Sequence, residues 1–341
     1  MSLGRSLSCS DPASGKLEVV EFERAVPKPG EIEIAVDATS VNPIDVHRST
    51  GYGRTLLSLL GAGTFPMVLG NDYLGTISAV GEGVRSFGIG DRVFGARKPS
   101  RAGTHASHVI ATAKADTVML LPDGLDQTAI AAVPYSFTTM WLAVRDAGLD
   151  RPNAPNKRVL VHGAAGGLGS LALQMLSEWG CNVTAIAFPK DHDACLRLGA
   201  SNAVDLSTTP FRDLAGAFDA TLNFATWDHD AQLPGCLRRN ALGHATTVHP
   251  MLRTFDENGL VLGGIKTVIG KRRSRKALPQ GAGKYGWTIF KPQEEALREL
   301  VRLLQRGRAK LDIGIEVPLS DGANAFDHIR TGQAGRALIT P

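Results

Sequence analysis

Cysteine is scarce in this chain, and the spacing of the few cysteines excludes two common uses of the residue. The 341 residues contain only four cysteines. No two of them form a CxxC pair, and none lies in a Cys/His cluster with the spacing of zinc ligands. We therefore interpret them as separate thiols in a reducing compartment, and we expect neither a disulfide scaffold nor a zinc module. They are Cys9, Cys181, Cys195 and Cys236.

The sequence also lacks an excess of one charge and a long apolar run. Its 37 Lys and Arg residues exceed the 33 Asp and Glu residues by a formal charge of +4, which provides no extended basic surface for nucleic acid. The sequence contains no run of about 18 apolar residues, which is the length that a membrane-spanning helix needs. The first residues also lack the basic-then-apolar order of a secretory signal. We expect a soluble, cytoplasmic protein with no nucleic-acid partner and no membrane span. At 43% hydrophobic residues, the chain can form the cores of two ordinary domains.

The pattern of the chain changes near residue 125. Before it, strand-like runs such as LEVVEFE and EIEIAVDATSV are separated by Gly- and Pro-containing turns, which is typical of a β-rich, barrel-like domain. After it, strand-like runs alternate with longer amphipathic segments, as in RVLVHG followed by SLALQMLSEWG, which predicts βαβ units and a parallel sheet. The predicted fold is α/β, with a β-rich domain at residues 1–125, a parallel-sheet domain at 126–290, and a return to the first domain at 291–341.

A glycine-rich turn follows the run RVLVHG. It reads VHGAAGGLGS, from Val161 to Ser170, and leads directly into a predicted helix. A dinucleotide turn needs a tight bend, a residue without a side chain near the pyrophosphate, and another where helix meets strand. We assign these roles to Ala164, Gly166 and Gly169 in that order. The alternative is a turn that is glycine-rich for conformational reasons alone. The predicted cofactor-binding residues of the turn are Ala164, Gly166, Gly167, Leu168 and Gly169.

The next strand-like run, NVTAIAF, should end at the adenosine ribose. A site for NAD usually has an Asp or Glu there, which binds the ribose hydroxyls. This chain has Ala187-Phe188-Pro189-Lys190 instead. The missing carboxylate and the nearby lysine both favour a 2′-phosphate, so we predict that the cofactor is NADPH and that Lys190 binds it. The alternative is a solvated pair of Lys190 and Asp191 at a helix start.

Seven stretches carry a family resemblance over nearly the whole chain. They are VNPIDVHRSTGYG (41–53), FPMVLGNDYLGTISAVGEGVRSFGIGDRVFGA (65–96), AAVPYSFTTMWLAV (131–144), RVLVHGAAGGLGSLALQ (158–174), LRLGASNAVDL (196–206), KYGW (284–287) and GQAGRALI (332–339). In their order and spacing the chain resembles the medium-chain dehydrogenase/reductase superfamily, in particular its zinc-free quinone oxidoreductase branch, with the reticulon-interacting mitochondrial oxidoreductases and their bacterial relatives. The resemblance implies a GroES-like first domain, a Rossmann second domain, hydride transfer from NADPH in a cleft between them, and a homodimer.

Zinc is not expected in the catalytic site. Zinc-dependent members of the superfamily carry a Cys and a His where this chain has Asn42 and Asn71, with Asp72 in the acidic position. An amide is a poor zinc ligand beside thiolate or imidazole. The four-cysteine structural lobe is missing as well, because residues 95–104 contain no cysteine. We predict no metal-binding residues. Asp72 then either contacts a stray ion or has a structural role in a turn or with a base.

Without a Lewis acid, only hydrogen-bond donors and a placed cation can stabilise the charge that develops during reduction. This favours acceptors that delocalise charge themselves, such as quinones and α,β-unsaturated carbonyls. By resemblance, the catalytic pocket is formed by Asn42, Asp45, Tyr52 and Thr139. Tyr52 either donates its phenolic proton or packs in its GYG turn. Asn42 precedes Pro43 and either contacts the substrate or forms an Asx turn.

Three further features lie in the second half of the chain. Asn223 ends the run FDATLNFA, where relatives have an acidic or polar residue followed by two glycines; here Phe-Ala-Thr follows, which leaves its predicted cofactor contact open. His249 is predicted near the nicotinamide, and its alternative is a surface or packing role. The run KRRSRK, from Lys271 to Lys276, either steers an anionic cofactor or is a solvated loop.

These observations predict a zinc-independent, NADPH-dependent oxidoreductase that transfers hydride to a small-molecule quinone or enone. Two alternatives remain. The first is an enal or enoyl-thioester reductase, which uses the same chemistry on another acceptor. The second is a catalytically silent NADPH-binding protein that senses redox state.

Overall fold

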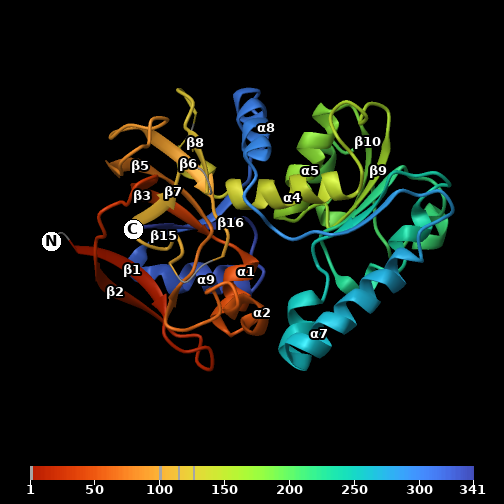
Figure 1. Cartoon of the computed structure of the whole chain (residues 1–341). Coiled ribbons are helices and arrows are strands. Elements are labelled where there is room, and N and C mark those ends of the chain that lie inside the picture. The colour runs from red at the N-terminus through yellow and green to blue at the C-terminus, as the bar shows by residue number, and fades with distance from the viewer. Residues whose placement is uncertain (1–2, 100–101, 114–115, 126) are drawn as a thin grey trace. The chain divides into compact units, whose positions relative to one another are not determined.

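The computed structural model describes residues 3–99, 102–113, 116–125 and 127–341 (Figure 1). They form two compact units. The first comprises Met1–Thr138, Phe255–Leu260 and Lys291–Pro341, and the second comprises Thr139–Thr254 and Val261–Phe290. The first unit is therefore discontinuous in sequence, and its first segment ends at Thr138, beyond the residue 125 that we expected.

The first unit contains two β-sheets. A small antiparallel sheet has the strand order β2-β1-β4, and a larger sheet has the order β15-β16-β3-β5-β6-β8, with β7 paired to β3. The C-terminal strand β16 lies antiparallel to β3, with Leu338 opposite Ser40. This pairing brings the end of the chain against the strand that precedes Asn42. The strands are β1 (Leu3–Cys9), β2 (Leu17–Glu23), β3 (Glu31–Val41), β4 (Met67–Val68), β5 (Asp72–Val80), β6 (Arg92–Ala96), β7 (His108–Thr112), β8 (Thr117–Leu120), β15 (Ile313–Pro318) and β16 (Arg336–Thr340).

Two hydrophobic clusters hold this unit together. One fills the barrel of β3, β5, β6, β7 and β8, with Ile32, Tyr73 and Val93 among its fully buried members. The other packs helix α9 against β16 and β1 through Phe326 and Ile339. The helices that belong wholly or partly to the unit are α1 (Pro43–Ser49), α2 (Arg54–Ser58), α3 (Gln127–Ile130), α4 (Pro134–Asp146), α7 (Met251–Arg275, through Phe255–Leu260), α8 (Glu294–Gln305) and α9 (Gly322–Arg330).

The second unit is built on one sheet of six parallel strands. Their order is β11-β10-β9-β12-β13-β14, so the direction of winding reverses between β9 and β12, which is the order of a Rossmann fold. The strands are short and apolar because both faces are covered; Val159, Leu160 and Val161 of β9 are fully buried. The strands are β9 (Arg158–His162), β10 (Asn182–Ile186), β11 (Asn202–Val204), β12 (Ala220–Asn223), β13 (Gly243–Thr246) and β14 (Lys284–Trp287).

The helices of the second unit connect these strands. Helix α5 contacts β9 and β10, and α6 contacts β11. Helix α7 is interrupted at Gly259, where φ is 69° and ψ is −176°. The predicted α/β fold with a GroES-like domain and a Rossmann domain is confirmed. The helices are α5 (Gly167–Glu178), α6 (His192–Arg197) and α7 (Met251–Arg275), with 3-10 turns η1 (Pro189–Asp191), η2 (Phe211–Leu214), η3 (Trp227–His229) and η4 (Leu233–Cys236).

All four cysteines are buried and free. Among the described residues, no helix has the length and the apolar character that crossing a membrane would require.

Candidate functional site

The glycine-rich turn joins the end of β9 to the start of α5, at the point where the strand order reverses (Figure 1). Gly163 adopts a φ of 79°, so the tight bend falls on Gly163 and not on Ala164, to which we assigned that role. The Ala164 amide donates to the Ile186 carbonyl over 3.2 Å, and the Gly166 amide donates to the Gly163 carbonyl over 3.1 Å. A Cβ on Gly169 would lie 2.2 Å from the Gly163 oxygen, which is why the helix can approach the turn so closely.

The N-terminus of α5 is built to receive an anion. No side chain caps it at Gly166, and the first amides of a helix, here those of Gly167, Leu168 and Gly169, have no acceptor within the helix. A Cβ on Gly166 would meet only the Gly163 oxygen, at 3.4 Å, so the space beside this residue is open. The free amides and the helix dipole fit the pyrophosphate of a dinucleotide.

No carboxylate follows β10 directly, because Ala187 and Phe188 come next and Asp191 stands only at the end of η1. The chain continues through exposed Phe188 into η1, which contains exposed Lys190. The His192 ring donates to the Ala187 carbonyl over 3.2 Å and closes this turn. Within the described ranges, Lys190 and Asp191 form no ion pair with each other, so the ammonium group is available to a ligand.

Two histidines beside the glycine turn escaped the sequence analysis. His162 is the last residue of β9, and its Nε2 lies 2.9 Å from Nδ1 of His229, so that one ring donates to the other. Burial lowers the pKa of His162 to about 4, with a further contribution from His229, and the ring is therefore neutral near pH 7. The only signal in the sequence was the His-Gly step at the end of a buried strand, and the His229 contact is 67 residues away.

Asn223 belongs to a buried polar cluster that ties β12, β13 and β14 together. Its Nδ2 donates to the Thr226 carbonyl over 2.9 Å and to Asp230 over 3.0 Å. Asp230 also accepts from His244 over 3.0 Å and from the Tyr285 hydroxyl over 2.6 Å. Burial acts to raise the pKa of Asp230, but the hydrogen bonds and the charge of His244 outweigh it and lower the pKa. The amide of Asn223 is thus engaged within the protein, and its cofactor contact stays a prediction.

His249 lies after β13, near the carboxyl end of the sheet. Its ring stacks on Trp287, with centroids 5.1 Å apart and 6° between the planes. Its Nε2 donates to the Thr288 carbonyl over 3.0 Å, which leaves Nδ1 as an acceptor. This buried atom has no hydrogen-bond partner among the described residues. Burial lowers the pKa of His249. The ring is therefore held firmly, with one acceptor nitrogen still available to a bound group.

Asn42 and Asp45, two of the predicted catalytic residues, lie together in the first unit. The Asp45 carboxylate accepts from the backbone amide of Asn42 over 2.9 Å, from the Gly70 amide over 3.1 Å and from the Asn71 side chain over 2.9 Å. These bonds fix the start of α1, where Pro43 occupies the first turn. Asp45 is fully buried, so it orders the backbone around Asn42.

A buried arginine from the C-terminal strand completes this cluster. Arg336 donates through Nη2 to the Asn42 carbonyl oxygen and, over 3.3 Å, to Ser136. The Asn42 amide nitrogen donates to Ser40 over 3.1 Å and to Asp72 over 3.3 Å. Burial raises the pKa of Asp72 to about 7, although Arg336 opposes the shift. The sequence analysis missed Arg336, which lies 294 residues from Asn42.

Tyr52 lines an open pocket of about 480 Å³ together with His47, Arg54 and Asp256, among other residues. The Asp256 carboxylate accepts from the amides of Gly53 and Thr55, over 2.6 and 2.9 Å, and so anchors the turn that carries Tyr52.

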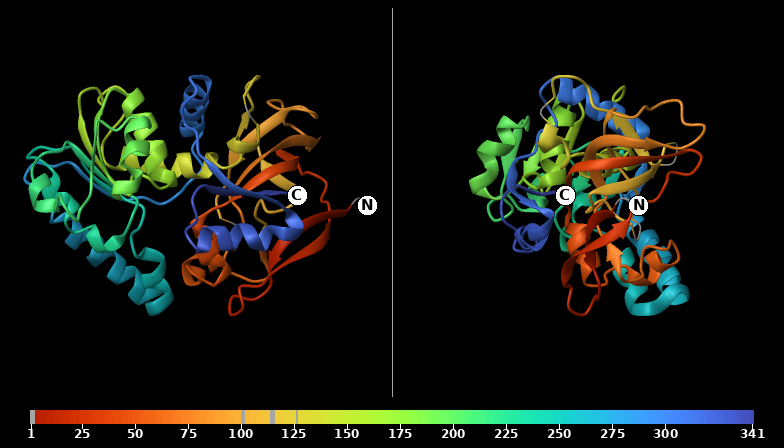
Figure 2. Two further views of the ribbon diagram at one scale, coloured as in Figure 1. Left: turned by 180° about the vertical axis from the view of Figure 1, so that it is seen from behind. Right: turned by 90° about the vertical axis from the view of Figure 1, so that its left-hand side faces the viewer.

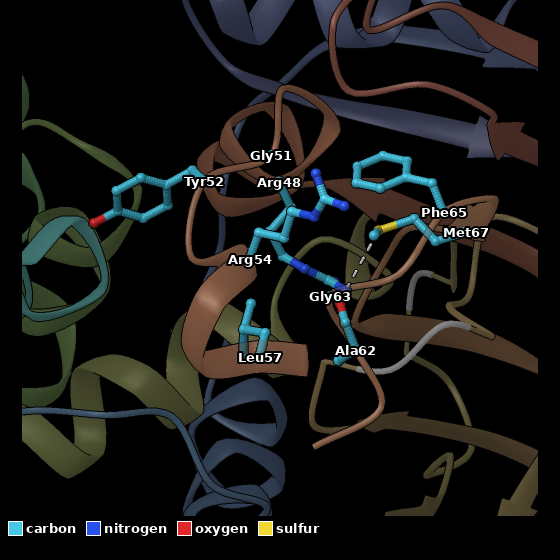
Figure 3. A pocket seen from close by; sticks show the side chains of 9 residues that line it. All are labelled: Arg48, Gly51, Tyr52, Arg54, Leu57, Ala62, Gly63, Phe65 and Met67. Carbon is cyan, nitrogen blue, oxygen red and sulfur yellow. Dashed lines mark hydrogen bonds between the residues drawn. The ribbon is translucent and has the colours of Figure 1, made fainter. Parts of the chain in front are cut away.

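On the other side of this turn is a narrow void, into which no water molecule fits. Figure 3 shows Tyr52 directed away from the void, in which Arg48 contacts the Ala62 carbonyl and Met67. Thr139, the fourth predicted catalytic residue, lies half-buried in α4 and belongs to the second unit. The structure brings Asn42 and Asp45 together, and the catalytic roles of all four residues stay predictions.

Potential metal ligands are dispersed. Over the part of the chain that the structure describes, no three His, Cys, Asp or Glu residues are grouped so that they could hold a metal ion.

Two protein families match the chain, one in its first part and one in its later part. The alcohol dehydrogenase GroES-like domain family matches residues 28–123. The zinc-binding dehydrogenase family matches residues 198–335. Together they account for more than half of the chain.

Known proteins resemble the chain over nearly its full length. The mitochondrial NAD(P)H oxidoreductase RTN4IP1 of Mus musculus is 30% identical over 95% of this chain and 86% of that protein. The solved structure of the quinone oxidoreductase from Coxiella burnetii has a TM-score of 0.79 at 21% identity, over 100% of both chains. The structure of CurK enoyl reductase has a TM-score of 0.75 at 21% identity, over 99% of both chains.

These comparisons correct one prediction and confirm another. A cytoplasmic protein was expected, but the RTN4IP1 relatives from mouse and human are mitochondrial, so that prediction is wrong. The family resemblance is confirmed, and with it the use of a nicotinamide cofactor. The chain belongs to the medium-chain dehydrogenase/reductase superfamily as a relative of RTN4IP1, and it is an NAD(P)H oxidoreductase.

Proposed function

We propose that the chain transfers hydride from NADPH to a quinone or an activated alkene without a catalytic metal. The observation that carries this proposal is the buried contact of Arg336 with Asn42. By the family resemblance, Asn42 stands where zinc-dependent members carry a metal ligand, so a guanidinium group bonded to it supports a site without metal.

The donor groups around Asn42 support a site without zinc. The side-chain oxygen of Asn42 already accepts from Arg336 and Ser136, and the Asp72 carboxylate accepts from Ser40 and Asn42. A divalent cation would have to displace these bonds and to lie close to the positive charge of Arg336, which is unfavourable inside a protein. A fixed cation can itself stabilise charge that develops on an acceptor.

The edge after β10 supports NADPH over NADH. The two residues directly after β10, Ala187 and Phe188, provide no carboxylate for free ribose hydroxyls, and Lys190 is exposed there with no ion pair among the residues that the structure describes. An ammonium group attracts a 2′-phosphate, whereas a carboxylate would repel it.

In this proposal, three features of the second unit would hold the cofactor, which supplies the hydride when bound. The amides of Gly167 to Gly169 bind the pyrophosphate, and Lys190 binds the 2′-phosphate. His249 presents its Nδ1 as an acceptor, with its ring orientation set by Trp287 and Thr288. The neutral His162 ring, at the end of β9, adds no negative charge beside the turn.

The test is a steady-state comparison of NADPH and NADH with quinones, enals and simple ketones, each with and without a chelator. We expect a kcat/KM at least about ten-fold higher with NADPH, turnover of quinones or enals, and no effect of the chelator. Loss of activity on chelation, restored by added zinc, would refute the metal-free mechanism. A preference for NADH would refute the role of Lys190.

The second candidate is an enoyl reductase, because the fold matches CurK enoyl reductase as closely as it matches the quinone oxidoreductase from Pseudomonas syringae, with a TM-score of 0.75 for each. Turnover of enals or enoyl thioesters with no turnover of quinones would select it.

A homodimer stays a prediction, and light scattering after size exclusion would test it. NADPH binding with no turnover of any acceptor would instead favour the redox sensor.

A further inference from the structure

The C-terminal part of helix α7, residues 261–275 (called α7C here), packs on its own unit through small side chains. Gly263 is buried, and a Cβ on Gly270 would lie 3.5 Å from the Trp287 ring. Thr267 and Ser274 lie on the same face, because residues four, seven and eleven positions along a helix lie above one another. The inward face of α7C therefore consists of glycine, threonine and serine.

The large aliphatic side chains of α7C point outward. Val261 is 76% exposed, and Leu262, Ile265, Val268 and Ile269 are each at least 50% exposed. At about 100° per residue, these five positions fall within an arc of about 120° on the helix. A surface helix of a soluble protein normally places such a stripe against the core. Exposed apolar stripes of this kind mark sites of association with a partner or a membrane. Figures 1 and 2 show α7 in cyan along the edge of its unit.

Basic side chains flank the aliphatic stripe. Lys266 and Arg273 project on one side of it and Lys271 and Arg275 on the other, while Arg272 follows it at the last turn. No Asp or Glu occurs between residues 258 and 293, and within the described part of the chain none of the cations from Lys271 to Lys276 forms an ion pair. The KRRSRK run is therefore the charged end of an amphipathic helix and not a loop.

We propose that α7C is a docking surface for an anionic lipid bilayer. A helix with an aliphatic face bordered by lysine and arginine lies in the plane of such a membrane, with its apolar side chains at the acyl boundary and its cations at the headgroups. It does not cross the bilayer, since fifteen residues span only about 22 Å.

The basic residues of α7C favour an anionic bilayer over a second copy of the chain or nucleic acid as the partner. A second copy that docked through the same face would bring two uncompensated basic clusters together. Nucleic acid would pair with the cations but would leave the aliphatic stripe in water. The proposal does not depend on the acceptor or the cofactor preference proposed above.

The test is sedimentation of the full-length protein with vesicles of phosphatidylcholine alone or with about one third phosphatidylglycerol. We expect binding to the anionic vesicles that is at least about ten-fold tighter than to the neutral ones, and that weakens in about 0.5 M salt. The variants I265S/I269S and R272Q/R273Q should each lose at least about ten-fold in affinity. Their NADPH oxidation in vesicle-free buffer should match that of the wild type.

Matched controls replace exposed residues elsewhere. V26S/I89S changes two exposed aliphatic residues, and R85Q/R212Q changes two exposed cations; both should bind vesicles like the wild type. Equal binding of wild type to neutral and anionic vesicles would overturn the proposal without any variant. If the α7C variants instead convert a dimer to a monomer and leave vesicle binding unchanged, the face is an interface between copies and the proposal is wrong.

Discussion

The two glycines of the turn before α5 should respond differently to alanine. In Gly169→Ala, the new Cβ would lie 2.2 Å from the Gly163 oxygen and 2.6 Å from the Ala164 Cα. Backbone atoms cannot rotate away, so we expect an overpacking cost of about 3 kcal/mol. The better helix propensity of alanine offsets about 1 kcal/mol. A net loss of about 2 kcal/mol should lower the Tm by about 4–8 °C.

Gly166→Ala should affect binding and not folding. The nearest atom to its Cβ is 3.4 Å away, and its φ of −74° suits alanine, so the stability cost should be only about 0.5 kcal/mol. The methyl group would occupy the space we assign to the pyrophosphate, and the Kd for NADPH should rise about ten-fold or more, or about 1.4 kcal/mol. Thermal unfolding and fluorescence titration measure the two effects. Wild-type NADPH affinity in Gly166→Ala, or equal losses of Tm in the two variants, would refute the assigned geometry.

Three further results are expected. Lys190→Ala should raise the Kd for NADPH about ten-fold and leave the Kd for NADH unchanged, because only NADPH carries the 2′-phosphate. The control is Lys28→Ala, which changes an exposed lysine elsewhere. Equal effects of Lys190→Ala on the two Kd values would contradict the assignment. The pKa of Asp72 is raised from 3.8 to about 7, so the native state retains a proton that the unfolded state loses, and stability should fall as pH rises from about 4 to 7. Asp72→Asn should flatten that dependence of the urea midpoint, and an unchanged slope would argue against burial as its cause. The pKa of His162 is lowered from 6.5 to about 4, so stability should fall as pH drops through that window. His162→Gln should remove this loss, and the same loss in His162→Gln would contradict its assignment to His162.

The cofactor turn shows how far local sequence reasoning reaches. The buried run RVLVHG, the glycines after it and the amphipathic segment that follows predict strand, turn and helix, because each depends on neighbours within a few residues. Even here the sequence misassigned the bend, which falls on Gly163. Gly163 and Ala164 are adjacent small residues, and only the paths of β9 and α5 decide which of them needs a positive φ.

The side chains around these elements were less predictable. The contact of Arg336 with Asn42 joins residues 294 positions apart, and the Tyr285 contact with Asp230 joins residues 55 apart. No local pattern marks an arginine in a C-terminal strand as the neighbour of an asparagine near residue 40. The same holds for the KRRSRK run, for which the sequence left cofactor steering and a solvated loop as alternatives, whereas the structure places it at the end of helix α7.

The sequence alone determined the two-unit α/β architecture, the dinucleotide turn and the absence of a carboxylate directly after β10, since hydrophobic periodicity, glycine placement and residue type are local properties. Only the tertiary structure decided that a buried guanidinium lies against Asn42, that Asn223 is engaged within a polar cluster, and that α7C exposes its aliphatic face. Those outcomes depend on which strands pair and which helix face meets the core, and strand pairing joins segments that share no sequence signal.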